Sequence, residues 1–137
     1  MCEFSESQLS DATNSLESRI CEFAMIRPSD NAPLADEALQ KSMHKTYTDA
    51  YQLTGFMGGD WAYASNTNDA VGLSCGLPEN KIPHEERRLG VYYLGWESTE
   101  LHEDGTKEEA FLEELRNLDP WMGAGTGAWY ALLRKHE

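Results

Sequence analysis

The stretch from Arg88 to Glu97, RLGVYYLGWE, constrains the fold more than any other part of the sequence. Its β-branched and aromatic residues favour an extended conformation. Side chains alternate between the two faces of a strand, and here both alternating sets are largely apolar. A strand that is buried on both faces lies inside a sheet. We therefore expect a central strand that helices cover on at least one side.

The region before this strand predicts two helices. Apolar residues recur at three- and four-residue steps over residues 9–23. Pro28 and the turn residues after it would end this first helix near Arg27. A second apolar stripe begins near Pro33, and Gly55 offers a left-handed stop. The two helices are expected to form an antiparallel hairpin.

Shorter elements surround the expected central strand. Two short strands around an Asn/Asp turn are predicted within residues 61–75. Residues 99–106 are expected to form a polar turn, followed by a helix over Lys107–Leu118. Residues 123–127, GAGTG, indicate a flexible loop before a last short helix or strand. The predicted fold is α+β: an N-terminal helical hairpin on a small, about three-stranded, mainly antiparallel sheet, with one or two C-terminal helices.

Length, charge and cysteine usage limit the class of protein. The 137 residues, 1–137, are expected to form a single domain. The net charge of −13 repels nucleic acid, so direct DNA or RNA binding is not expected. Cys2, Cys21 and Cys75 form no C-x-x-C pair. Because the sequence shows neither a signal-peptide pattern nor an apolar run of membrane-spanning length, we expect a cytoplasmic protein without a membrane partner.

Acidic residues are concentrated between Glu97 and Asp119, where nine acids accompany only two bases. Such a run is either a solvated face or an interface with a basic partner. Glu109 and Glu113 repel each other at a spacing of four residues, a small cost that a partner would offset. The residues expected at that interface are Glu103, Asp104, Glu108, Glu109 and Glu113, with Trp96, Trp121 and Trp129 as aromatic anchors.

No catalytic, cofactor or metal motif is recognisable in the sequence. The GAGTG loop is not followed by the lysine of a P-loop, and no strand is expected directly before it. The triplets His84-Glu85-Glu86 and His102-Glu103-Asp104 contain metal-ligand residue types. They should lie at opposite ends of a strand about 30 Å long, too far apart to share an ion. We expect both triplets to be solvent-exposed loops, with no catalytic residue, cofactor or metal.

Three classes of function remain open. The leading prediction is an inhibitor of a basic protein, such as one that binds nucleic acid, in the manner of toxin-immunity proteins or phage-encoded anti-defence inhibitors. The alternative is a small-molecule-binding domain or enzyme with a pocket between sheet and helices, using Tyr92, Asp60, His84 or Cys75. The third is a homo-oligomeric structural subunit.

Overall fold

The computed structural model describes residues 18–69 and 80–133. Within these ranges the strands are β1 (Ile20–Ile26), β2 (Phe56–Tyr63), β3 (Gly90–Trp96) and β4 (Gly127–Leu132). The α-helices are α2 (Glu37–Thr48), α3 (Thr99–Gly105) and α4 (Glu109–Leu118). Short 3-10 turns lie at η2 (Asp49–Gln52), η4 (His84–Glu86) and η5 (Asp119–Trp121). No helix in this described part of the chain is long and apolar enough to cross a membrane.

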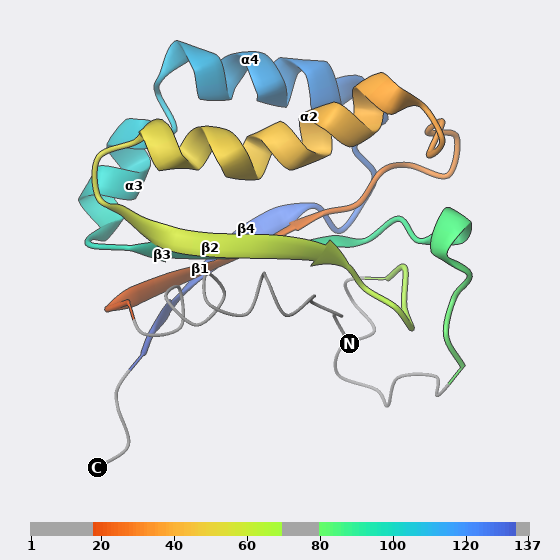
Figure 1. The fold of residues 1–137 in the computed structure, drawn as a ribbon, viewed down its shortest axis with the longest axis horizontal. Helices are drawn as coiled ribbons and strands as arrows, with labels where there is room; N and C mark the ends of the chain where they lie inside the picture. Colours follow the sequence, from red (N-terminus) through yellow and green to blue (C-terminus); the bar gives the residue numbers. More distant parts are fainter. Residues whose placement is uncertain (1–17, 70–79, 134–137) are drawn as a thin grey trace.

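The strands form one antiparallel sheet in the order β2-β3-β1-β4. Helix α2 follows β1, and helices α3 and α4 follow β3, so the element order is strand, helix, strand, strand, helices, strand. Figure 1 shows α2 and α4 side by side on the same face of the sheet, with α3 at one end of it. Residues that are distant in sequence therefore meet in the layer between helices and sheet.

The central strand predicted from RLGVYYLGWE is confirmed. Strand β3 pairs with β1 on one side and β2 on the other. Tyr92, Leu94 and Trp96 belong to the core under the helices, whereas Val91 packs in a second cluster on the opposite side of the strand. Burial on both faces explains why this segment carries so few polar residues.

The predicted N-terminal helical hairpin is wrong. Residues 20–26, assigned to the first helix, form β1, which pairs along its length with β3 and β4. The segment ICEFAMI has apolar residues at helical steps, but it also contains β-branched and aromatic residues and has two strand neighbours. The sheet accordingly has four strands. The earlier part of the predicted helix, up to residue 17, lies outside the described residues.

The helix predicted near Pro33 is confirmed, with a later start than expected. Asp36 caps α2 by accepting a hydrogen bond from the Leu39 backbone N–H at 2.9 Å. Leu39 and Met43 face the sheet and are almost fully buried. Gly55 has the expected left-handed conformation, with a φ of 86°, but the helix ends before it, at Thr48, and the short η2 turn follows.

The region after β3 contains two helices, where a polar turn and one helix were predicted. Ser98 accepts a hydrogen bond from the Leu101 backbone N–H and starts α3 across the predicted turn. Capping by a serine hydroxyl satisfies a backbone donor at the helix start and permits a helix in this polar segment. Helix α4 matches most of the predicted Lys107–Leu118 helix.

Gly59 lies where β2 approaches β3 closely. A Cβ atom at this position would stand 2.2 Å from the Tyr93 carbonyl oxygen and 3.1 Å from the Leu94 Cα, both backbone atoms. We expect Gly59→Ala to lower the free energy of unfolding by about 1–3 kcal/mol, because backbone must shift to admit the methyl group. Urea denaturation followed by circular dichroism measures this. Gly127→Ala, whose Cβ would meet only Trp129 ring atoms at 3.4 Å or more, is the control and should cost less.

An ion pair joins α2 to α4. Nζ of Lys45 lies 2.6 Å from Oε1 of Glu114, whose side chain is 5% exposed. Burial on its own would raise the pKa of Glu114, but hydrogen bonds from Lys45 and Ser42 and the attraction of the Lys45 charge outweigh it and lower the pKa. The ionised carboxylate is therefore the form that the folded protein favours.

This lowered pKa predicts a pH-dependent contribution to stability. A carboxylate with a depressed folded pKa stabilises above its unfolded pKa, about 4.3, and loses that effect as pH falls through the folded value. The difference in melting temperature between wild type and Glu114→Gln should therefore shrink with acidification through this window. Glu113→Gln controls for the loss of one negative charge on the same helix. A difference that stays constant with pH would contradict this account.

Candidate functional site

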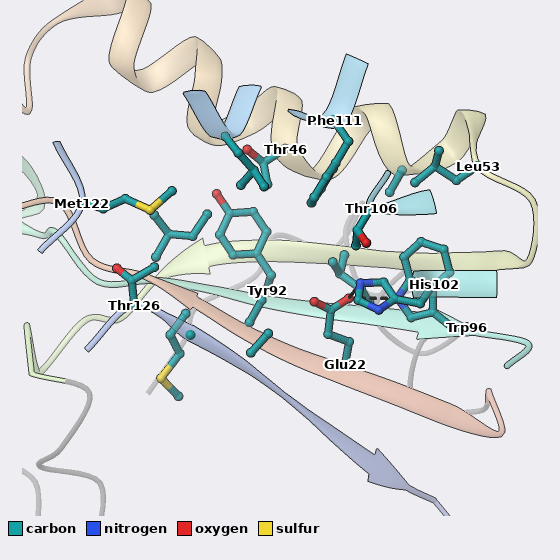
Figure 2. Close-up of a pocket in the computed structure, with 18 residues that line it drawn as sticks. Glu22, Thr46, Leu53, Tyr92, Trp96, His102, Thr106, Phe111, Met122 and Thr126 are labelled. Atoms are coloured by element: carbon teal, nitrogen blue, oxygen red, sulfur yellow. Dashed lines mark hydrogen bonds and ion pairs between the residues drawn. The ribbon is translucent and has the colours of Figure 1, made fainter. Parts of the chain in front are cut away.

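A pocket of about 290 Å³ lies between the sheet and the helices. We call it the sheet–helix pocket. Its walls are mostly apolar, from residues of β1, β3, α2, α3, α4 and the segment 122–128. The polar side chains that line it are Glu22, Thr46, Tyr92, His102, Thr106 and Thr126. Figure 2 shows them around the cavity, with Glu22, His102 and Trp96 gathered at one end. No lysine or arginine is among its described lining residues.

Glu22 is the acidic residue of this pocket and is 5% exposed. It comes from β1, and its Oε2 accepts a hydrogen bond from the Trp96 Nε1–H at 3.0 Å. The same Oε2 lies 3.0 Å from Nε2 of His102. Among the described residues, Oε1 has no hydrogen-bond partner. Both contacts that hold the carboxylate are therefore made through Oε2, and Glu22 lines the cavity.

His102 connects Glu22 to Tyr130. Its Nδ1 is hydrogen-bonded to the hydroxyl of Tyr130 on β4. Burial, together with the charges of Glu22 and Glu103, raises the pKa of Tyr130. Because Nε2 of His102 faces the Glu22 carboxylate, which can only accept, the hydrogen on Nε2 donates to Oε2. The hydrogen bond at Nδ1 and the contact at Nε2 hold the imidazole ring between Tyr130 and Glu22.

The arrangement is suited to proton abstraction from a small molecule. A carboxylate in a largely apolar pocket can act as a general base when a bound carbon or oxygen acid comes within hydrogen-bond reach. Trp96 and His102 would continue to stabilise Oε2 while Oε1 takes the proton. Sequence reasoning proposed Tyr92 for such a pocket, and Tyr92 does line it, with its hydroxyl donating to the Met43 carbonyl at 2.6 Å.

The other polar residues proposed for that pocket lie elsewhere. Asp60 is buried on β2, with a side chain that points away from the helices, since its neighbour Trp61 stacks on Tyr92. His84 is exposed on η4 and lines a different pocket. Cys75 lies outside the described residues. Cys21, on β1, is buried, and burial raises the pKa of its thiol to about 11.

The predicted interface residues are exposed with one exception, Trp96. Trp96 is only 2% exposed, and its indole N–H is used by Glu22, so it cannot act as an anchor. Trp121 and Trp129 are 38% and 54% exposed, on η5 and β4. The five acids, Glu103, Asp104, Glu108, Glu109 and Glu113, are exposed on and between α3 and α4. Two of them already have partners, since Asp104 pairs with Lys107 and Glu109 with Arg116.

The glycine-rich segment 123–127 is held against β1, where a flexible loop was expected. The Gly123 N–H donates to the Arg27 carbonyl at 2.6 Å, and the Arg27 N–H donates to the Thr126 hydroxyl at 3.0 Å. It leads into strand β4, so the helix that an anion-binding loop would need does not follow. Thr126 and Gly127 line the sheet–helix pocket.

Sequence reasoning missed Glu22, His102 and Tyr130 as a unit. His102 was expected in a solvent-exposed loop, but it lies in α3 and is 8% exposed. One signal was present, since Glu22 is the single charged residue in the apolar run ICEFAMI. A charge inside a buried strand requires a partner and is a reason to look for a site. The sequence around His102 and Tyr130 contains no comparable sign that these residues belong to a site.

The topology and site can be compared with known proteins. No protein-family model matches the sequence, and no curated protein matches it. Solved structures match the four-stranded antiparallel sheet with helices on one face. The fold is a ferredoxin-like α+β fold. This fold belongs to the predicted α+β class. Its four-stranded sheet and its first strand contradict the predicted three-stranded sheet and N-terminal helical hairpin.

Three solved structures illustrate the likeness. SnoaB from Streptomyces nogalater, a cofactor-independent oxygenase, is 10% identical with a TM-score of 0.57, and the match covers 87% of this chain and 97% of SnoaB. A candidate antibiotic biosynthesis monooxygenase from Nitrosomonas europaea is 9% identical with a TM-score of 0.58, covering 82% and 95%. A dimeric protein of unknown function with a ferredoxin-like fold from Bacteroides fragilis is 7% identical with a TM-score of 0.56, covering 82% and 94%.

These similarities overturn the leading functional prediction. The similar structures include monooxygenase-like proteins, whereas the prediction named immunity proteins and anti-defence inhibitors. The alternative, a small-molecule-binding domain or enzyme with a pocket between sheet and helices, agrees better with them and with the sheet–helix pocket. The identities are too low to carry an activity over, so the likeness shows the fold alone.

Proposed function

We propose that this protein is an enzyme that binds an uncharged, largely apolar small molecule in the sheet–helix pocket and removes a proton from it. The observation that carries the proposal is the Glu22 carboxylate, oriented by Trp96 and His102 through Oε2 in an otherwise apolar cavity. An anionic substrate would be repelled by Glu22, and no lysine or arginine among the described lining residues would offset that.

Each polar side chain then has a defined role. Glu22 is the general base and accepts the proton at Oε1. Trp96 and His102 donate to Oε2 and keep the carboxylate in place, while Tyr130 holds the His102 ring through Nδ1. The apolar walls exclude water, which strengthens the electrostatic interactions of the carboxylate in the pocket.

Oxygenation is the specific reaction that the likeness to SnoaB supports. In a cofactor-independent route, the deprotonated carbon supplies both electrons to dioxygen and forms a C–O bond. The resulting hydroperoxide loses water, so a CH₂ group and O₂ give a C=O group and H₂O without an external reductant. Glu22 would take the first proton and give it to the peroxide, which becomes the hydroperoxide. It would then take the second carbon-bound proton as the O–O bond breaks and give it to the departing hydroxide.

Exchange of carbon-bound hydrogen tests the proposal without knowledge of the natural substrate. 2-Tetralone is an uncharged bicyclic ketone with acidic α-hydrogens, and their replacement by deuterium in D₂O is followed by proton NMR. We expect exchange above the buffer rate, together with a shift of the Trp96 indole N–H signal when the ketone binds. A shift of that signal without accelerated exchange would contradict the role of Glu22. Oxygen uptake during exchange would support the oxygenase form.

A further inference from the structure

A second pocket lies beside the sheet–helix pocket, on the other side of Phe111 and Leu53. Its volume is about 520 Å³, and its walls come from η2 and the two residues after it, from α3 and from the start of α4. We call it the η2–α3 pocket. Among the described residues, Phe111 and Leu53 are the two that line both pockets, so their side chains lie at the boundary. The sheet–helix pocket therefore ends at two apolar side chains, with further space beyond them.

Leu53 is the tightly packed part of this boundary. It follows η2, and its side chain packs against Gly105 at the end of α3. A Cβ atom added at Gly105 would lie only 2.9 Å from Cδ1 of Leu53, so a glycine is needed to leave room for the leucine. Because the two residues are in such close contact, the Leu53 side chain has little room to move towards α3.

Phe111 is the larger part of the boundary. Figure 2 shows its ring reaching from α4 towards the sheet, and the side chain is half-buried. Glu114 follows three residues later on the same side of the helix, and its ion pair with Lys45 joins α4 to α2. The helix that carries Phe111 is therefore held against its neighbour, and the ring can leave the boundary only by rotation of its own side chain.

We infer that Phe111 sets the greatest length of substrate that the proposed active site accepts. This inference rests on the proposed function, because it concerns the same pocket. A longer molecule with its acidic C–H group at Glu22 would need the space that the Phe111 ring occupies, and forcing extra atoms against a packed side chain is unfavourable. The substrate class is therefore a compact, uncharged, apolar molecule with an acidic C–H group. Removal of the ring would extend this class to molecules that reach into the η2–α3 pocket.

The affinities of a short and a long ketone test the size limit separately from catalysis. The short probe is 2-tetralone. The long probe is 6-benzyloxy-2-tetralone, which has the same acidic α-hydrogens and carries an added aryl ether on its other ring. The shift of the Trp96 indole N–H signal measures the binding of each ketone and requires no proton transfer. Wild type is expected to bind the long ketone about tenfold or more weakly than the short one.

Phe111→Ala is expected to reduce this preference for the short ketone by about tenfold or more, because the ring no longer separates the two pockets. The ratio of kcat/KM for α-hydrogen exchange, long ketone over short, should rise by a similar factor. Leu112→Ala is the matched control. Leu112 is the next residue of α4, is also half-buried and lines neither pocket, so this variant should keep the wild-type preference in both measurements.

The outcomes separate this inference from the proposed function. Wild type that binds both ketones equally, folded Phe111→Ala that keeps the wild-type preference, or Leu112→Ala that loses it would overturn the size limit, even if 2-tetralone is exchanged. The expected change in binding preference without any catalysed exchange would support the size limit and contradict proton abstraction. If neither ketone shifts the Trp96 signal of folded wild type or folded Phe111→Ala, both are overturned.

Discussion

Glu22→Gln is expected to lower the rate of protein-catalysed α-hydrogen exchange in 2-tetralone by about 100-fold or more, the range that general-base catalysis contributes. Glutamine has the shape of glutamate, and its amide oxygen can still accept the Trp96 indole N–H, so the pocket should remain formed. An amide oxygen does not take a proton near neutral pH. Proton NMR in D₂O measures the rate, and the Trp96 indole shift shows that the ketone still binds.

Glu100→Gln is the matched control for this variant. Glu100 is exposed in the first turn of α3, and its substitution changes the net charge by the same amount outside the pocket. The Glu100→Gln variant should exchange the α-hydrogens of 2-tetralone at the wild-type rate. Full activity in a Glu22→Gln variant that still binds the ketone would show that Glu22 is not the base.

Tyr92→Ala is expected to cost about 3–5 kcal/mol of unfolding free energy, the range for removing a large buried aromatic side chain. Tyr92 is fully buried, stacks on Trp61 and donates its hydroxyl to the Met43 carbonyl. Its removal therefore deletes contacts with both the sheet and α2. Tyr92→Phe keeps the ring and loses one hydrogen bond, which should cost about 1 kcal/mol.

Urea denaturation of both variants measures these costs by circular dichroism. Leu132→Ala is the control, because Leu132 is 73% exposed at the end of β4 and should change stability by about 0.5 kcal/mol at most. A Tyr92→Ala variant no less stable than Leu132→Ala would contradict the packing described for this core.

Local sequence patterns were sufficient for the elements whose pattern has one interpretation. The run RLGVYYLGWE is apolar on both faces and became the central strand β3, and the stripe containing Leu39 and Met43 became α2. Residues 20–26 have apolar residues that suit either a helix or a strand. Their pairing with β3 and β4, more than 60 and 100 residues away, decided the outcome.

The candidate site could not be assembled from sequence because its members are brought together by the sheet. Glu22 and Trp96 are 74 residues apart, and Tyr130 follows His102 by 28. Cross-strand pairing places Glu22 directly opposite both Leu94 and Tyr130, and this register was unknown from the sequence. The strongly acidic composition pointed instead to a basic partner, because net charge describes the surface and carries no information about an interior pocket.

A crystal structure of the protein soaked with 2-tetralone tests the central claim most directly. The account predicts the ketone in the sheet–helix pocket, with an α-carbon facing Oε1 of Glu22 and with Oε2 still bound by Trp96 and His102. Ketone bound only outside this pocket, or in it with the Glu22 carboxylate turned away from the α-carbons, would contradict the account.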